Sequence, residues 1–271
     1  MIPGWLCSRR AGSLSLIVVI GLSTTIYSSL AQSGTCVLPS QHAGVTFPVE
    51  LIGANWACRL QPIISHYTTA NKLGPLRTPL PEAVYLYFLD HPPMAAALVN
   101  RLNLGLYRAE MRGPGRYWAN DGEGTEGIVQ LVYQDRTSRV YYLEGSYDSR
   151  FLSHITGKAV VLLRMNHVTD SNGVETMDST LVSYTRLDNR WLAGIVSFLR
   201  PVAGSAVKRK LAKGVDTVNR LSQVMRQQPD RVVSEATKSP ALSSDEVAFL
   251  KYALVNLRHP SGATQSRTSS P

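Results

Sequence analysis

Residues 207–225 read VKRKLAKGVDTVNRLSQVM, and this stretch decides the fold. Its apolar positions recur every three or four residues, so they form one stripe along a helix of 3.6 residues per turn. The stripe consists of Val207, Leu211, Gly214, Val218, Leu221 and Met225. Lysine, arginine and glutamine occupy the other sides and are expected to face water. Such a helix needs an apolar surface to cover its stripe, and the rest of the chain should supply it.

The chain before this helix supplies that surface as short strands between about 106 and 187. Apolar and polar residues alternate there with period two, as over residues 107–111. Turn sequences such as Gly113-Pro114-Gly115 and residues 170–173 (DSNG) separate the runs. Short turns join neighbouring strands antiparallel. We therefore predict six to seven antiparallel strands in one curved sheet.

Helices are predicted on both sides of this meander. Two short ones cover 81–90 and 92–103, and Pro81 suits a first helical turn. Ahead of them, residues 63–69 are predicted as a first strand and 74–81 as a loop. Pro201 predicts a kink before the long helix.

A last short helix is expected at 244–257. Ser243 and Glu246 have the spacing of a capping box at its start. The tail after Pro260 is rich in Ser, Thr, Gly and Pro, which predicts disorder.

The first 31 residues have the three parts of an export signal. An arginine pair at 9–10 precedes an apolar run over 14–22, and Ser29 and Ala31 fit a small-residue cleavage pattern. The run is shorter than the roughly 20 residues that cross a bilayer. A cleaved signal and a periplasmic or secreted protein are therefore predicted, and an uncleaved signal that anchors the chain in the membrane is the alternative.

Removal of that signal leaves two of the three cysteines, Cys36 and Cys58. In an oxidising compartment such a pair predicts a disulfide, and closing this loop contributes on the order of 3 kcal/mol. Two unrelated thiols are the alternative. The predicted organisation follows in chain order: a signal peptide (1–31), an N-terminal extension with this disulfide (32–62), a main domain (63–228), a linker with a short C-terminal helix (229–258) and a disordered tail (259–271).

Composition limits the class of protein. The chain has 271 residues, of which 44% are hydrophobic and 17% charged, so it can bury a core. Its net charge of +9 favours anionic surfaces. The basic residues are spread out, and only Lys208, Arg209, Lys210 and Lys213 cluster, without interleaved aromatic residues. Nucleic-acid binding is therefore not predicted.

Motifs for known chemistry are missing from the sequence. The six histidines are far apart, and the chain has no Cys-x-x-Cys, Gly-x-Ser-x-Gly or phosphate-loop pattern. We assign no metal, no cofactor and no catalytic residue, and expect a binding protein more than an enzyme.

The element order resembles the START-like (helix-grip) superfamily, which includes polyketide cyclases and lipid-transfer domains. The resemblance covers about 63–227 and is carried by Pro81-Glu82-Ala83-Val84-Tyr85 at the first helix, the paired helices, the meander and the long closing helix. It implies an α+β fold in which the sheet wraps around a long C-terminal helix. It also implies that a hydrophobic small molecule or lipid binds between the two.

Side chains on the strands and the long helix are the candidate lining of that cavity, with packed core as their alternative role. The candidates are Tyr107, Met111, Trp118, Tyr133, Tyr142, Leu163, Met165, Tyr184, Leu211 and Val218. Glu144, Arg164 and Asp178 are candidates for holding a polar head group, and ion pairs on the outside of the sheet are their alternative.

Two other functions remain open. The first is a cyclase or hydrolase that uses an inward carboxylate such as Glu144 or Asp178. The second is an interaction scaffold without a ligand. The apolar segment Trp191–Leu199 is expected either to touch a membrane surface or to pack on the N-terminal extension.

Overall fold

The structure is a computed structural model and describes residues 36–148, 154–169, 171, 173–188 and 196–258, with side chains from residue 204 to 257 in the last range. The predicted signal peptide, the predicted tail and most of the segment Trp191–Leu199 lie outside the described residues.

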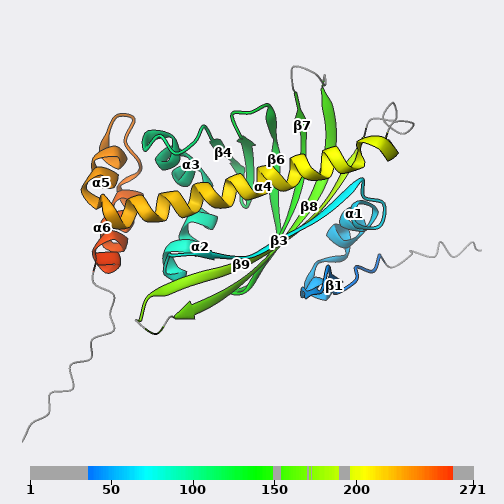
Figure 1. The fold of residues 1–271 in the computed structure, drawn as a ribbon, viewed down its shortest axis with the longest axis horizontal. Helices are drawn as coiled ribbons and strands as arrows, with labels where there is room; N and C mark the ends of the chain where they lie inside the picture. Colours follow the sequence, from blue (N-terminus) through cyan, green and yellow to red (C-terminus); the bar gives the residue numbers. More distant parts are fainter. Residues whose placement is uncertain (1–35, 149–153, 170, 172, 189–195, 259–271) are drawn as a thin grey trace, which may run out of the picture. The chain divides into compact units, whose positions relative to one another are not determined.

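Seven strands form one antiparallel sheet, as the meander predicted (Figure 1). They are β3 (Thr69–Thr78), β4 (Arg108–Gly113), β5 (Arg116–Asn120), β6 (Thr125–Gln134), β7 (Ser138–Tyr147), β8 (Ile155–Thr169) and β9 (Glu175–Leu187). The spatial order is β3-β9-β8-β7-β6-β5-β4, so every strand pairs with its chain neighbour except β3, which joins the edge beside β9.

The first strand differs from its prediction. Residues 63–65 belong to a helix, and β3 continues through the segment that was expected to be a loop. A shift in register between Leu73 and Leu76 accommodates Gly74 and Pro75. Proline is tolerated at such an irregularity on an edge strand, because its missing N–H removes little pairing there.

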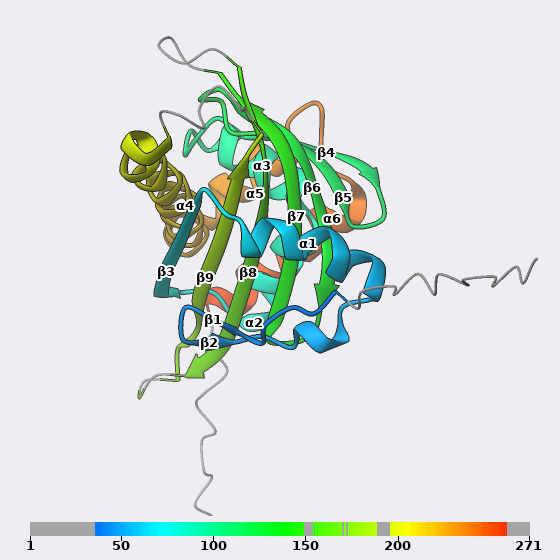
Figure 2. The ribbon, with the colours of Figure 1, turned by 90° about the vertical axis from the view of Figure 1, so that its right-hand side faces the viewer.

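The N-terminal extension is a structured layer on one face of the sheet. It contains β1 (Gln41–His42), β2 (Val45–Thr46), the 3₁₀-helix η1 (Val49–Leu51) and α1 (Ala54–Ser65), which lie in front of the sheet in Figure 2. We call these elements the N-terminal layer and the face that they cover the outer face. Helix α1 was not predicted from the sequence, because Pro62 lies inside it. Burial of Leu60 and Ile63 against the sheet outweighs that local signal.

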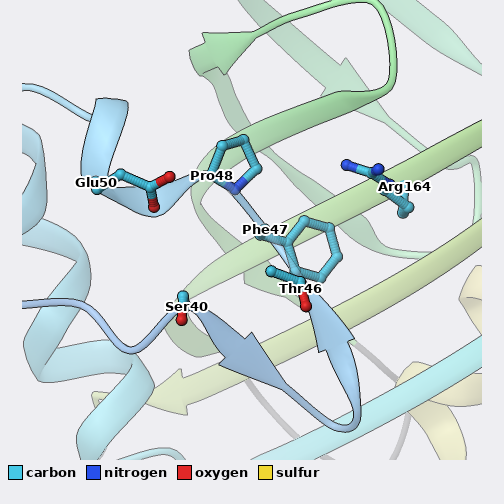
Figure 3. Close-up of a pocket in the computed structure, with 6 residues that line it drawn as sticks. All are labelled: Ser40, Thr46, Phe47, Pro48, Glu50 and Arg164. Atoms are coloured by element: carbon cyan, nitrogen blue, oxygen red, sulfur yellow. The ribbon is translucent and has the colours of Figure 1, made fainter.

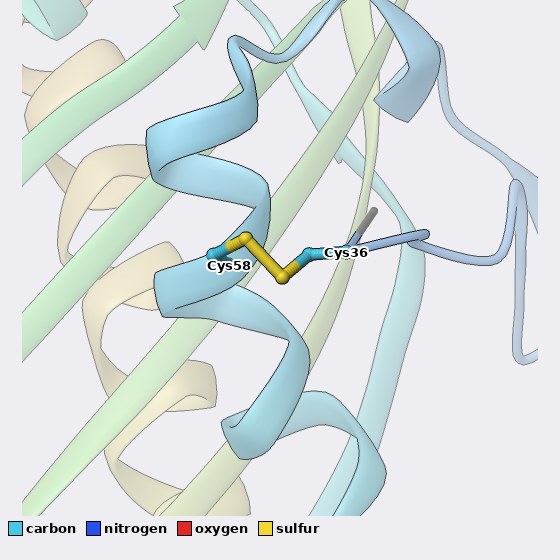
Figure 4. Close-up of a disulfide and its surroundings, with 2 residues drawn as sticks. All are labelled: Cys36 and Cys58. Carbon is cyan, nitrogen blue, oxygen red and sulfur yellow. A yellow bond between two sulfur atoms is a disulfide. The ribbon is translucent and has the colours of Figure 1, made fainter. Parts of the chain in front are cut away.

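The predicted disulfide is present. Cys36 and Cys58 are bonded at 2.06 Å, with their Cα atoms 4.9 Å apart, and the bond ties the start of the described chain to α1 (Figure 4).

Helices cover the opposite face, which we call the inner face. They are α2 (Glu82–Asp90), α3 (Pro92–Arg101), α4 (Val196–Gln227), α5 (Pro229–Thr237) and α6 (Ser244–Arg258). The paired helices α2 and α3 confirm their prediction. The capping box of α6 is also confirmed, since the N–H of Ser243 donates to Glu246 Oε2 at 2.9 Å and the N–H of Glu246 donates to Ser243 Oγ at 3.3 Å.

The long helix α4 has 32 residues and continues through Pro201 as one helical segment. It is not the last element, because α5 and α6 follow it. The predicted linker after residue 228 is therefore partly wrong: Val232 and Ala236 of α5 are buried against Leu250 and Leu254 of α6.

Both edges of the sheet reach α4. At one edge, Gly204 lies next to Thr69 at the start of β3, and Arg226 donates to the carbonyl oxygen of Pro79 just after its end. Near the opposite edge, Lys210 contacts Asp121 in the turn between β5 and β6. The sheet must therefore curve between these two contacts.

A row of glycines crosses the sheet where it curves. Gly127, Gly145 and Gly157 are direct neighbours on β6, β7 and β8. A Cβ atom on Gly145 would lie 2.2 Å from the carbonyl oxygen of Glu126, and one on Gly127 would lie 2.4 Å from that of Glu144. The row lets the backbones approach closely and leaves a strip of the inner face without side chains.

Candidate functional site

The apolar stripe of α4 is packed along only half of its length. Leu221 and Met225 are 1% and 0% exposed, whereas Val207, Leu211 and Val218 are half-buried. A Cβ atom built on Gly214, in the middle of the stripe, meets no other atom within 4 Å. The first half of the helix therefore borders open space.

The inner face of the sheet likewise has a packed part and a part whose side chains are only half-buried. Leu163, Met165 and Met177 are nearly fully buried in the core formed with the helices. Val129 and Leu131 of β6, Leu143 of β7 and Val161 of β8 are only half-buried, although they lie on interior strands. Cross-strand pairing places these four side chains on the inner face. We call them, together with Val207, Leu211 and Gly214 of α4, the open half of the inner face.

A pocket of about 410 Å³ lies at the end of this region near the β5–β6 turn. It is lined by Glu123, Tyr147, Ala206, Arg209, Lys210 and Lys213, and we call it the mouth pocket. Tyr147 belongs to the inner face, two residues after Gly145. The ammonium group of Lys210 lies 5.2 Å from the centroid of the Tyr147 ring, within the range of a cation–π interaction.

Two ion pairs connect α4 to the turn at this pocket. Lys210 contacts Asp121, and Lys213 contacts Glu123. Burial raises the pKa of Asp121, but its hydrogen bonds from Lys210 and from backbone N–H groups outweigh that effect and hold the pKa below its usual value. The hydrogen bond to Glu123 raises the pKa of Lys213. Asp121 is therefore ionised and Lys213 is charged at neutral pH.

A polar cluster that was not predicted from the sequence lies between the two halves of the inner face. Arg139 on β7 is 4% exposed and donates to Asp90 at 2.7 Å. Tyr85 shares a hydrogen bond of 2.9 Å with Ser179, and burial raises the pKa of both Tyr85 and Tyr141. The sequence contains one sign of this cluster. Arg139 and Tyr141 lie at two-residue spacing before Leu143 on β7, so all three side chains share one face of the strand.

The aromatic residues predicted to line one cavity lie on both faces of the sheet. Tyr133, Tyr142 and Tyr184 pack in the core under the N-terminal layer, where Arg59 of α1 lies 4.9 Å from the ring centroid of Tyr142. Trp118 also lies on the outer face, because it pairs with Ile128, which pairs with Glu144. These four residues do not face the open half.

The other predicted lining residues are on the helix side or at the sheet edge. Leu163 and Met165 are packed core, and Tyr107 is partly buried against the same core. Met111 is 64% exposed on the edge strand β4. Val218 is also partly buried against this core, and of the predicted lining residues only Leu211 borders the open half.

None of the three predicted head-group residues faces the open half, since all lie on the outer face of the sheet. Glu144 accepts a hydrogen bond from Tyr142, and Arg164 donates to Ser138. Asp178 pairs with Arg77 at 2.8 Å, a contact that lowers the pKa of Asp178. The enzyme hypothesis that needed an inward carboxylate at 144 or 178 therefore loses both candidates.

A second pocket of about 410 Å³ lies between the N-terminal layer and the outer face. Figure 3 shows Glu50 and Arg164 on opposite sides of Phe47 and Pro48 in this pocket. It has no contact with the open half, because the sheet separates them.

The described residues contain no group of three or more His, Cys, Asp and Glu side chains placed to hold a metal ion. None of the helices built from these residues has the length and hydropathy required to span a lipid bilayer.

Comparisons with known proteins show similarity to solved structures. No family model and no curated protein matches the chain. The crystal structure of a conserved protein from Geobacillus kaustophilus is similar to 57% of this chain over 95% of its own length, with a TM-score of 0.41 and 10% sequence identity.

Proposed function

We propose that this protein is an exported binding protein of the helix-grip type that holds a hydrophobic, lipid-like molecule between the sheet and α4. The observation that carries the proposal is the open half of the inner face. Apolar side chains on interior strands and on the facing helix stripe are only half-buried there, and Gly214 borders open space.

The energetics favour a ligand at this place. Each Å² of apolar surface left in contact with water costs about 25 cal/mol relative to burial. An apolar molecule in the open half would cover both walls at once. The glycine row leaves space on the sheet side, and the packed half of the core fixes the remainder of α4, so binding would not require the fold to change.

The export part of the proposal rests on the disulfide. Bonds of this kind persist in oxidising compartments and are rare in the reducing cytosol. The Cys36–Cys58 bond therefore supports delivery through the predicted signal. Secretion of a reporter fused after residue 40, and loss of secretion when residues 14–22 are deleted, would test it.

Binding is tested with N-phenyl-1-naphthylamine, an apolar dye whose fluorescence rises in apolar surroundings. We expect enhancement with the wild-type protein and loss of most of it in Gly214→Leu, which places a side chain in the open half. Ala212→Leu adds the same side chain at an exposed position of α4 and should leave the enhancement unchanged. Equal enhancement in all three proteins would place the dye elsewhere and contradict the proposal.

Native mass spectrometry of gently purified protein provides a second test. We expect a bound small molecule that is absent from Gly214→Leu. A protein that carries no ligand and also gives no dye enhancement would overturn the proposed function.

A further inference from the structure

The mouth pocket has an excess of positive charge. Its lining contains three cations, Arg209, Lys210 and Lys213, and one anion, Glu123. Asp121 and Glu123 neutralise the two lysines through the ion pairs with α4. Arg209 is exposed and makes no ion pair with any acidic side chain in the described part of the chain. One guanidinium therefore remains available in a pocket that already exists.

The pocket also lies at the end of the apolar region. On α4, the lining residues Ala206 and Lys210 directly precede Val207 and Leu211 of the open half. On β7, Tyr147 follows Gly145 and Leu143 along the inner face. A molecule with its tail along Val207, Leu211 and Gly214 would present its other end to the cations.

We infer that the ligand is an amphiphile with one apolar chain and one anionic oxygen group, a carboxylate or a phosphate monoester, held in the mouth pocket by Arg209. This inference rests on the proposed function and specifies its ligand class. The guanidinium is planar and matches either oxygen group through paired N–H donors. Lys210 and Lys213 add positive potential, and the Tyr147 hydroxyl supplies one more donor.

The test compares three ligands with the same chain and different ends: dodecanoate, dodecyl phosphate and dodecan-1-ol. Each displaces N-phenyl-1-naphthylamine from the wild type, Arg209→Gln and Lys208→Gln. Lys208 is the matched control, because it is an exposed neighbour on α4 with the same charge that does not line the pocket. Both variants change an exposed helical residue and are expected to fold, which circular dichroism verifies.

We expect Arg209→Gln to weaken the binding of at least one anionic ligand by about twofold to fivefold, the range for an exposed ion pair. Dodecan-1-ol should bind Arg209→Gln as it binds the wild type, and Lys208→Gln should change none of the three. The anion that responds identifies the head group as carboxylate or phosphate. Added salt should weaken the binding of that anion and leave the binding of dodecan-1-ol unchanged.

Two results would overturn the inference while leaving the proposed function standing. The first is that Arg209→Gln and Lys208→Gln weaken the binding of the anions equally, which would mean that only the overall charge of the protein matters. The second is that dodecan-1-ol binds and the Arg209→Gln substitution changes the binding of neither anion. Absence of dye binding by the wild type would overturn both proposals together.

Discussion

Replacing Gly145 or Gly214 by alanine adds one methyl group and should change the free energy of unfolding in opposite directions. Gly145→Ala tests the close approach of the strands, and Gly214→Ala tests whether the space beside α4 is open. At Gly145 the new Cβ would lie 2.2 Å from the carbonyl oxygen of Glu126 and 2.9 Å from the Cα of Gly127. Strands β6 and β7 must then separate by most of an ångström. Weakening about two ladder hydrogen bonds costs about 2 kcal/mol or more, so Gly145→Ala should lower the free energy of unfolding by that amount.

Gly214→Ala should do the reverse. Its Cβ meets no atom within 4 Å, and alanine in a helix interior is about 1 kcal/mol more favourable than glycine. For a protein of this size 1 kcal/mol corresponds to about 2–4 °C in Tm. We therefore expect a Tm about 4–8 °C lower for Gly145→Ala and about 2–4 °C higher for Gly214→Ala.

Thermal unfolding followed by circular dichroism, with urea unfolding as the second measurement, checks both values. Gly204→Ala is a useful control, because it changes the same helix where the new Cβ meets Thr69 at an ordinary 3.9 Å. A destabilised Gly214→Ala would mean that the space beside the stripe is filled. An unchanged Gly145→Ala would mean that the strands are not in close contact at the glycine row.

Three further predictions concern the N-terminal layer and the ion pairs at α4. Replacing both Cys36 and Cys58 by alanine should lower the free energy of unfolding by about 3 kcal/mol, as urea unfolding with and without reductant would measure; equal stability would show that the bond constrains nothing. Burial lowers the pKa of His42, so the unfolded chain takes up a proton first and stability falls as pH drops below 6.5 toward the lower folded pKa. His42→Asn should remove this loss between pH 7.5 and 5.5, and a parallel loss in both proteins would assign it to other groups. The folded pKa of Asp121 lies below the unfolded value of 3.8. Its ion pair therefore stabilises the protein fully above pH 3.8, and this stabilisation is lost as the pH falls through the folded pKa. Asp121→Asn should cost about 1 kcal/mol at pH 7 and progressively less as the pH falls below 3.8, and a cost that does not decline in acid would exclude the ion pair as its cause.

Local patterns predicted most of the elements but not the role of each sheet face. The period of two located β8, yet Val160 and Leu162 alternate with Val161 and Leu163, so both faces read as apolar. Both faces are in fact covered, one by helices and the other by the N-terminal layer. Alternation alone cannot say which set faces α4, and this is why Tyr142 and Tyr184 were placed in the wrong layer.

Other misses have local causes. Pro62 concealed the helical spacing of Leu60, Ile63 and Ile64 in α1. No local pattern identifies Arg139 as part of a cluster, because its partner Asp90 is 49 positions away in the chain. The capping box of α6 was predictable, because both of its residues lie within one helical turn.

The disulfide-linked N-terminal layer makes the outer face of the sheet independent of the inner face. Cys36–Cys58 holds α1 over Val140, Val160 and Val182, so the interior strands keep a dry side whatever happens beneath α4. Under the proposed function, a ligand could then enter or leave on the inner face while the outer face of the sheet stays covered.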